Sequence, residues 1–240
     1  MRAIALFRWL AILVAFAAAL ALLASAPGYR FGLWHFRTGI SLVRWSGYLG
    51  IAGTVLALVG LIVPRLRGDG PRVLVVAFVA AVTVAGITGY WAQRAWSVPR
   101  IHDISTDTEN PPQLVATLPL RAGAENTAVY GGPKLAAAQL QGYPDIKPLE
   151  VAMPPQAAFQ RAQQAAREMG WQIVAADPAG GRLEATDTTA WFGFRDDIVV
   201  RIAAAGSGSR VDVRSVSRVG RSDIGTNARR IRGFLDRLGA

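Results

Sequence analysis

The residues best suited to binding chemistry lie close together near the end of the chain, between Val213 and Asn227. This stretch reads VRSVSRVGRSDIGTN and contains three Arg, three Ser, one Asp and one Asn among a few aliphatic residues. Arg side chains and the free backbone N–H groups at the start of a helix both bind anions. The stretch is therefore a candidate site for a phosphate, a sulfate or a carboxylate.

The spacing of these residues places them on defined faces of a predicted strand. Arg214 and Arg218 are an even number of positions apart and project from one face, whereas Ser215 and Ser217 point to the opposite, core-facing side. Two adjacent acids upstream and the residues at the start of the last helix complete the set. The candidate ligand-binding residues are Arg214, Ser215, Ser217, Arg218, Ser222, Asp223, Asn227, Asp196 and Asp197.

A plainer interpretation, which we favour, needs no ligand. Ser222 or Asp223 would cap the last helix, and the two central Ser would bond to backbone. The acids would pair with Arg across neighbouring strands; the acids considered are Asp196, Asp197 and Asp212, and their partners are Arg214 and Arg218. Exposed pairs contribute only up to about 1 kcal/mol each, so stability alone would not require so many charges.

No catalytic residue, cofactor or metal site is predicted. The only His residues are His35 and His102, and a Ser-His-Asp arrangement would require His102 to fold back against one of the Ser. Asp196 and Asp197 are adjacent, so they point to opposite faces of a strand. The chain contains no Cys, no zinc-ligand spacing and no phosphate-binding loop.

The second half of the chain predicts an α+β core over residues 151–240. A helix opens at Pro155 and ends at Gly170, and another begins at about Gly225. Between them lie four predicted strands, WQIVAAD, RLEATDTTAWFGF, DDIVVRIAA and RVDVRSVSRV, separated by Gly-rich turns. We expect an antiparallel meander of about four strands with a helix before and after it. Residues 99–150 are rich in Pro, Gly and Ala, and we expect an extended tether and an irregular wrapping segment.

Residues 1–98 predict a transmembrane region with three helices. Apolar stretches at about 7–26, 45–63 and 73–91 are each long enough to cross the roughly 30 Å hydrocarbon core of a bilayer. The only acid in residues 1–98 is Asp69, which lies in a loop. Because transport paths usually contain ionisable residues within the spans, this composition argues against a pump or a channel.

Charge and loop composition predict the orientation of the chain. Nine Arg and one acid give residues 1–98 a net charge of +8, whereas residues 99–240 carry only +2, so nucleic-acid binding is not predicted. Arg2 precedes the first stretch and Arg8 lies at its start, and Arg65, Arg67 and Arg72 follow the second. The positive-inside rule places both groups in the cytoplasm. The C-terminal domain would then face the periplasm from a bacterial inner membrane.

The first apolar stretch could also be a cleaved signal peptide. It ends in ASA at residues 24–26, a small-residue pattern typical of cleavage sites. Pro27 directly after it hinders cleavage, and the apolar run is long. We therefore favour an uncleaved helix, and the predicted orientation is the same in both cases.

Several segments of the second half together resemble a known family. The segments IHDISTDTENPP, YPDIKPL, GWQIVAADPAGGRLEAT, WFGFRDDIVVRI and VDVRSVSRVGRSDIGTNARRI occur in order. They resemble the family called domain of unknown function 1499, from roughly Ile101 to Leu238. The resemblance implies a shared fold and no catalytic assignment, because the family has no established activity.

Three functions are compatible with these observations. The first is a membrane-anchored, non-catalytic binding or scaffolding module that recognises an envelope component, which could be an anionic lipid, a glycan or a protein. The second is an enzyme that acts on an envelope lipid or glycan through Asp196, Asp197 and His102. The third is a small accessory subunit of a larger membrane complex. In each case the lipid bilayer is a partner.

Overall fold

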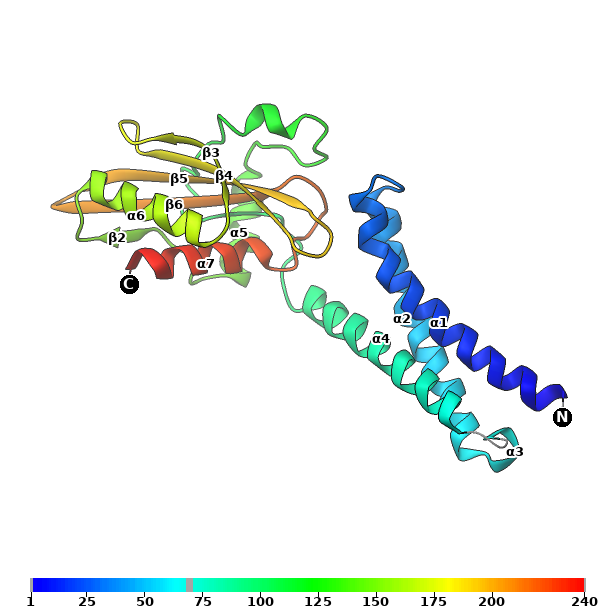
Figure 1. The fold of residues 1–240 in the computed structure, drawn as a ribbon. Coiled ribbons are helices and arrows are strands. Elements are labelled where there is room, and N and C mark those ends of the chain that lie inside the picture. The colour runs from blue at the N-terminus through cyan, green and yellow to red at the C-terminus, as the bar shows by residue number, and fades with distance from the viewer. Residues whose placement is uncertain (1, 68–70, 240) are drawn as a thin grey trace. The chain divides into compact units, whose positions relative to one another are not determined.

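The structure, a computed structural model, describes residues 2–67 and 71–239 and contains two compact units (Figure 1). The first unit is formed by Met1–Arg94 with Trp191–Gly193, and the second by Ala95–Ala190 with Phe194–Ala240. Asp69 lies outside the described residues.

The first unit contains the three predicted apolar helices and one short helix. The long helices are α1 (Arg2–Arg30), α2 (Phe36–Ile62) and α4 (Arg72–Trp96), and α3 (Pro64–Arg67) follows α2. All three long helices are sufficiently long and apolar to cross a membrane. Each extends beyond its predicted stretch. Helix α2 begins at Phe36, where the side chain of His35 caps it by accepting a hydrogen bond from the backbone N–H of Arg37. The expected loop before residue 45 is therefore largely helical.

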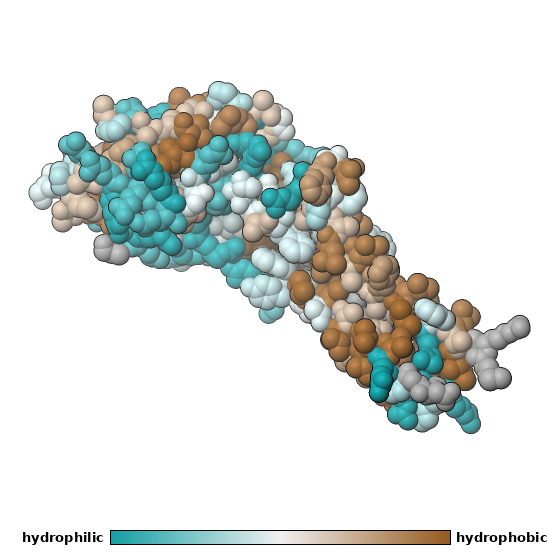
Figure 2. All heavy atoms as spheres, viewed as in Figure 1, coloured by the Kyte–Doolittle hydropathy of each residue, from teal (hydrophilic) through white to brown (hydrophobic). Residues whose placement is uncertain are grey.

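Small residues form the contact surface between the three long helices. The buried positions recur at alternating spacings of three and four, which keeps them on one face of each helix; they are Ala11, Ala15, Ala18 and Leu22 in α1, Ser46, Gly50, Gly53, Ala57 and Gly60 in α2, and Leu74, Ala77, Ala81 and Val84 in α4. A Cβ atom on Gly50 would lie 2.9 Å from the backbone nitrogen of Ala85. Large apolar side chains cover the outer surface, which is brown in Figure 2.

The second unit contains a six-stranded antiparallel sheet. Its strands are β1 (Asp103–Ser105), β2 (Leu149–Val151), β3 (Gln172–Asp177), β4 (Arg182–Thr188), β5 (Arg195–Ala205) and β6 (Gly208–Ser217). Their order is β1-β6-β5-β4-β3, and β2 also pairs with β6. Strands β3 to β6 form the predicted meander in hairpin order. The predicted second strand ends at Thr188 instead of Phe194, and residues 189–194 form the turn to β5.

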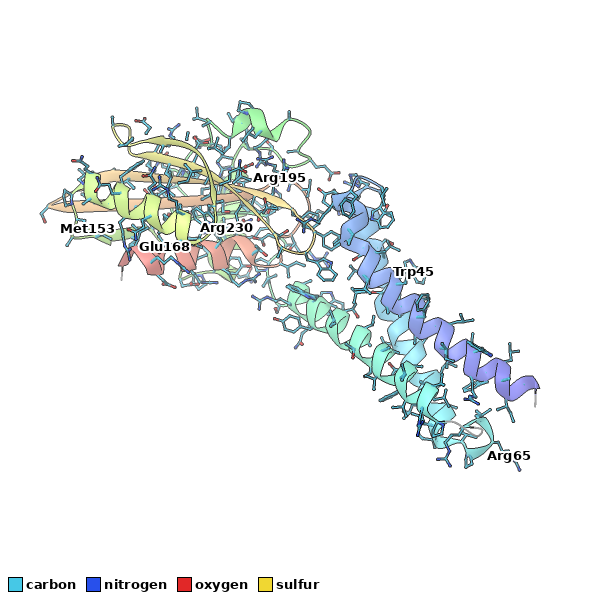
Figure 3. The ribbon with its side chains drawn as sticks, in the orientation of Figure 1. Trp45, Arg65, Met153, Glu168, Arg195 and Arg230 are labelled. Carbon is cyan, nitrogen blue, oxygen red and sulfur yellow. The ribbon has the colours of Figure 1, made fainter. Side chains whose placement is uncertain are left out.

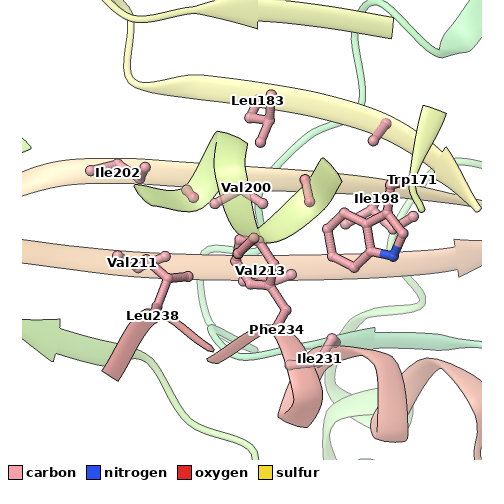
Figure 4. Packing of buried hydrophobic residues seen from close by; sticks show 14 of the residues in the cluster. Trp171, Leu183, Ile198, Val200, Ile202, Val211, Val213, Ile231, Phe234 and Leu238 are labelled. Carbon is pink, nitrogen blue, oxygen red and sulfur yellow. The ribbon is translucent and has the colours of Figure 1, made fainter. Parts of the chain in front are cut away.

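The two predicted helices, α6 (Pro155–Glu168) and α7 (Thr226–Gly239), pack on one face of the sheet and enclose the main core. The core contains Ile198, Val200 and Val213 from the strands and Phe234 from α7 (Figure 4). The rings of Trp171 and Phe234 stack with their centroids 5.0 Å apart. Alternate residues of β5 and β6 face this core, as their period of two predicts.

The opposite face of the sheet is covered by residues 106–131, which we call the wrap. Val199 and Val216 face it and form a small apolar cluster with Leu114 and Ala128 of the wrap. The wrap includes a 3-10 helix, η1 (Leu118–Arg121), and leads into α5 (Gly132–Gly142). The segment 99–150, expected to be an extended tether with irregular wrapping, thus contributes two strands and a helix.

Helix α5 also closes one edge of the sheet at β1. The side-chain amide of Gln139 donates a hydrogen bond to the carbonyl oxygen of Ser105 at 2.7 Å, and its oxygen accepts one from the N–H of Ser105 at 2.9 Å. These are the two hydrogen bonds that a neighbouring strand would make with Ser105. Gln139 is fully buried.

Candidate functional site

The sheet separates the nine candidate residues onto its two faces. Asp197, Arg214 and Arg218 lie on the face that the wrap covers, and Arg214 and Arg218 share this face as their spacing predicts. The other candidates lie beside α7 or in the joint between β6 and α7; they are Asp196, Ser215, Ser217, Ser222, Asp223 and Asn227. The candidates therefore form two separate clusters.

Arg214 is fully buried and connects the wrap to the sheet. Its guanidinium group donates two hydrogen bonds to Asp103, at 2.9 and 2.8 Å. It also donates to the carbonyl oxygens of Pro112 at 3.2 Å and Ala128 at 2.8 Å. The expected pairing with Asp196, Asp197 or Asp212 does not occur, because Asp103 of the neighbouring strand β1 occupies the guanidinium group.

Tyr130 covers Arg214 on the wrap side. The guanidinium carbon of Arg214 lies 5.3 Å from the centre of the Tyr130 ring, a distance typical of a cation–π contact. Burial raises the pKa of Tyr130 to about 12.

Asp197 is the centre of the second buried cluster under the wrap. Its carboxylate accepts hydrogen bonds from Arg121 at 2.7 Å and from Arg218 at 2.9 and 2.7 Å. The hydroxyl of Thr186 donates a further bond at 2.7 Å. The expected Asp197–Arg218 pair is present. Arg121, which approaches from the wrap, was not anticipated from the sequence.

The side chain of Glu184 binds the backbone of the wrap. The carboxylate accepts hydrogen bonds from the backbone N–H groups of Val115 and Thr117, each at 2.9 Å, and from the Thr117 hydroxyl at 2.9 Å. Glu184 is fully buried. A buried carboxylate requires such partners, so Glu184 anchors the middle of the wrap to β4.

Asp212 has different partners from those expected. It pairs with Arg201 at 2.8 Å and Arg210 at 3.1 Å. Both Arg also contact Asp107 of the wrap at 2.9 Å. Asp212 and Asp107, joined through these two Arg, thus form a fourth charged attachment between the sheet and the wrap.

Arg230 of α7 is the centre of the cluster on the helical face (Figure 3). Its guanidinium group donates to Asp196 and to Asp187, each at 2.7 Å. Burial lowers the pKa of Arg230, but the two carboxylates outweigh burial and the pKa is raised overall. Asp196 was expected to pair with Arg214 or Arg218, which lie on the other face of the sheet.

Asn227 connects the two Ser of β6 to His102, the residue before β1. Its side-chain oxygen accepts from the hydroxyl of Ser215 at 2.7 Å, and its amide donates to Ser217 and to the carbonyl oxygen of His102, each at 3.0 Å. Ser215 and Ser217 face the core side, as their spacing predicts. They bond to the side chain of Asn227, whereas we expected bonds to backbone.

Asp223 caps α7, as one of the two predicted alternatives. Its carboxylate accepts hydrogen bonds from the backbone N–H groups of Asn227 at 2.7 Å and Gly225 at 2.8 Å. Ile224, which lies between Asp223 and Gly225, has a φ of 53°, and this backbone conformation is costly for a β-branched residue. The hydroxyl of Ser222 accepts from the N–H of Ile224 at 3.2 Å. These bonds fix the joint and occupy N–H groups that an anion would otherwise bind.

Asp223 is expected to make the stability of the domain depend on pH. Burial raises its pKa to about 6, against 3.8 for the ordinary carboxyl group. Between these two values the folded protein retains a proton that the unfolded chain has released, so ionisation favours unfolding as the pH rises. We expect the unfolding free energy of the wild-type protein to fall by roughly 2–3 kcal/mol between about pH 4 and pH 7, relative to Asp223→Asn.

The measurement is denaturant unfolding of both proteins across this pH range, followed by circular dichroism in the same detergent. Asp236→Asn, which removes an exposed carboxylate from α7, serves as the control and should retain the wild-type pH dependence. Identical pH profiles for wild type and Asp223→Asn would contradict the prediction.

The arrangement around His102 does not form a catalytic triad. Burial lowers the pKa of His102, although the carboxylate of Asp103 and the backbone of Arg221 act in the opposite direction. Asp196 and Asp197 lie on opposite faces of the sheet, as their adjacency predicts, and each is held by Arg. Within residues 2–67 and 71–239, no group of three His, Cys, Asp or Glu could hold a metal ion.

The sheet domain matches a known protein family. A family model described as "Protein of unknown function (DUF1499)" matches residues 103–238. This range begins at the first residue of β1 and includes all six strands and nearly all of α7. No curated protein matches the chain.

Proposed function

This chain belongs to the DUF1499 family of unknown function, and from this premise we propose that it is a membrane-anchored, non-catalytic binding module. Its α1, α2 and α4 helices would anchor it in the inner membrane of a bacterium. Its sheet domain would recognise a component of the cell envelope, such as an anionic lipid, a glycan or another protein.

The observation that carries this proposal is the very short connection between α4 and the sheet domain. Helix α4 ends at Trp96, and Val98 already packs against the core of the domain. Ile101 is buried in the same core. Only Ser97 separates the end of the helix from Val98, so the tether between α4 and the packed chain of the domain is one residue long. A tether this short limits how far the domain can lie from a membrane that α4 crosses, which suits recognition at the membrane surface.

The candidate charged residues pair with one another inside the domain, and this supports a binding role over a catalytic one. Asp196, Asp197 and Arg214 are each engaged in buried ion pairs that hold α7 or the wrap in place. An enzyme acting through Asp196, Asp197 and His102 would need these groups to converge on one bond. Their separation onto two faces of the sheet favours the non-catalytic function.

Binding is tested by titrating the full-length protein in detergent with three classes of ligand: phosphatidylglycerol, phosphatidylcholine and soluble peptidoglycan fragments. Saturable binding of one class without chemical change supports the proposal. Turnover of any of these molecules, or the absence of saturable binding to every envelope component tested, contradicts it.

We also propose that the sheet domain faces the periplasm, because the Arg-rich segment between α2 and α4 favours the cytoplasm. The chain has no Cys, so a single introduced thiol reports its own location. We expect Ser207→Cys, in the turn between β5 and β6, to react with a membrane-impermeant maleimide in intact spheroplasts. Pro71→Cys, just before α4, should react only after the membrane is permeabilised. The reverse pattern would contradict the proposed orientation.

A further inference from the structure

The Arg residues of the sheet domain differ in whether an acid neutralises them. Under the wrap Arg121, Arg214 and Arg218 have carboxylate partners, and on α7 Arg230 and Arg232 have them. Arg100 and Arg221 are both exposed, and neither has an ion-pair partner within the part of the chain that the structure describes. Exposed cations of this kind remain available to an external anion.

Backbone contacts bring Arg100 and Arg221 to the same place. The N–H of Asp223 donates to the carbonyl oxygen of Ile101 at 3.1 Å, and the N–H of Ser217, at the end of β6, donates to the carbonyl oxygen of His102 at 2.9 Å. The segment that starts at Arg100 therefore lies alongside the joint that starts at Arg221. The nearby acids are used within the fold: Asp223 caps α7, Asp196 pairs with Arg230, and Asp103 pairs with Arg214. The exposed side of the joint is consequently cationic.

The position of Arg100 in the chain keeps this cationic surface near the membrane. Arg100 is four residues beyond Trp96, the last residue of α4, and four extended residues reach at most about 14 Å. Trp96 is 83% exposed, and exposed Trp at the end of a membrane helix is typical of the lipid–water boundary. Tyr90 and Trp91 in the preceding turns are also exposed. Arg100 is thus within reach of the layer that contains lipid phosphate groups.

We propose that Arg100 and Arg221 together bind the phosphate group of an anionic phospholipid at the surface of the membrane. A guanidinium group matches phosphate oxygens with two parallel hydrogen bonds, and two adjacent guanidinium groups favour a lipid whose net charge is negative. This inference rests on the proposed function and specifies its ligand as the headgroup of a lipid. In this proposal Arg100 and Arg221 bind the ligand in place of Arg214 and Arg218, whose guanidinium groups are occupied under the wrap.

The test is native mass spectrometry of the full-length protein in detergent, titrated with phosphatidylglycerol or with phosphatidylcholine. We expect tighter binding of phosphatidylglycerol by the wild-type protein. The double variant Arg100→Gln/Arg221→Gln should weaken phosphatidylglycerol binding by roughly fivefold per Arg, on the order of 20-fold in total. Binding of phosphatidylcholine should not change.

The matched control is Arg161→Gln/Arg167→Gln, which removes two charges from α6 instead. It should bind phosphatidylglycerol as the wild type does, and both variants should retain the wild-type circular dichroism spectrum. An equal loss of affinity in both variants would overturn the inference, since general charge would then explain binding. Complete competition by millimolar inorganic phosphate would assign the site to a free anion and overturn the lipid assignment.

The outcomes also separate this inference from the proposed function. If the Arg100/Arg221 variant binds phosphatidylglycerol as tightly as the wild type while a glycan binds saturably, the lipid site is wrong and the binding module stands. If no envelope component binds to the wild type, both fail.

Discussion

Replacing Arg214 with methionine is expected to destabilise the sheet domain by roughly 3–5 kcal/mol. The substitution leaves the carboxylate of Asp103, which is 3% exposed, buried without its cation. It also removes the donors to the carbonyl oxygens of Pro112 and Ala128, so the wrap loses two attachments. Denaturant unfolding of the full-length protein measures the loss, and hydrogen–deuterium exchange of residues 106–131 should show that the wrap opens first.

Two controls separate the effect of burial from the loss of an ion pair. Arg232→Met breaks the exposed pair with Asp145 and should cost less than about 1 kcal/mol. The double variant Asp103→Leu/Arg214→Met should recover much of the lost stability, because it buries no unpaired charge. If Arg214→Met and Arg232→Met are equally stable, the assignment of Arg214 as a buried anchor is wrong.

Replacing Gly50 with leucine is expected to disrupt the packing of α1, α2 and α4. The new Cβ atom would lie 2.9 Å from the backbone nitrogen of Ala85 and 3.1 Å from the carbonyl oxygen of Ala81. Backbone atoms cannot rotate away as side chains do, so the helices must separate. The cost should reach about 3 kcal/mol, at the upper end of the range for overpacked interiors.

The melting temperature of the full-length protein in a mild detergent, followed by tryptophan fluorescence, measures this effect. Gly86→Leu on α4 is the matched control, because a Cβ atom there has no neighbour within 4 Å. Its melting temperature should stay close to that of the wild type. Equal melting temperatures for the two leucine variants would show that Gly50 is not at a close helix contact.

The parts of the fold with a clear apolar period could be predicted from the sequence. Strands β3 to β6 alternate, and α6 and α7 carry apolar residues at spacings of three and four. Strands β1 and β2 have three residues each, which is too short to show a period. Helix α5 has one fully buried residue, Gln139, so it lacks the apolar stripe by which amphipathic helices are recognised.

The candidate site could be predicted only in part, because sequence patterns treat Arg as an exposed residue. The spacing of Arg214 and Arg218 correctly gave them one face. The partner of Arg214 is Asp103, which is 111 positions away in the chain, and no local pattern indicates such a contact. Arg230 lies on the buried side of α7 because Asp187 and Asp196 neutralise it. Glu184 gave no signal either, because it alternates with the core residues Leu183 and Ala185 and so occupies a position that the period of two predicts to be exposed.

The amide of Gln139 also limits how the domain can associate with itself. Strand β1 already has both hydrogen-bonding sides satisfied where Gln139 contacts Ser105, so no incoming strand can add there. Edge-to-edge growth into a fibre requires two open edges on every molecule. At β1, Gln139 therefore closes one of the routes by which copies of the domain could join their sheets. A single side chain thereby disfavours polymerisation through this strand.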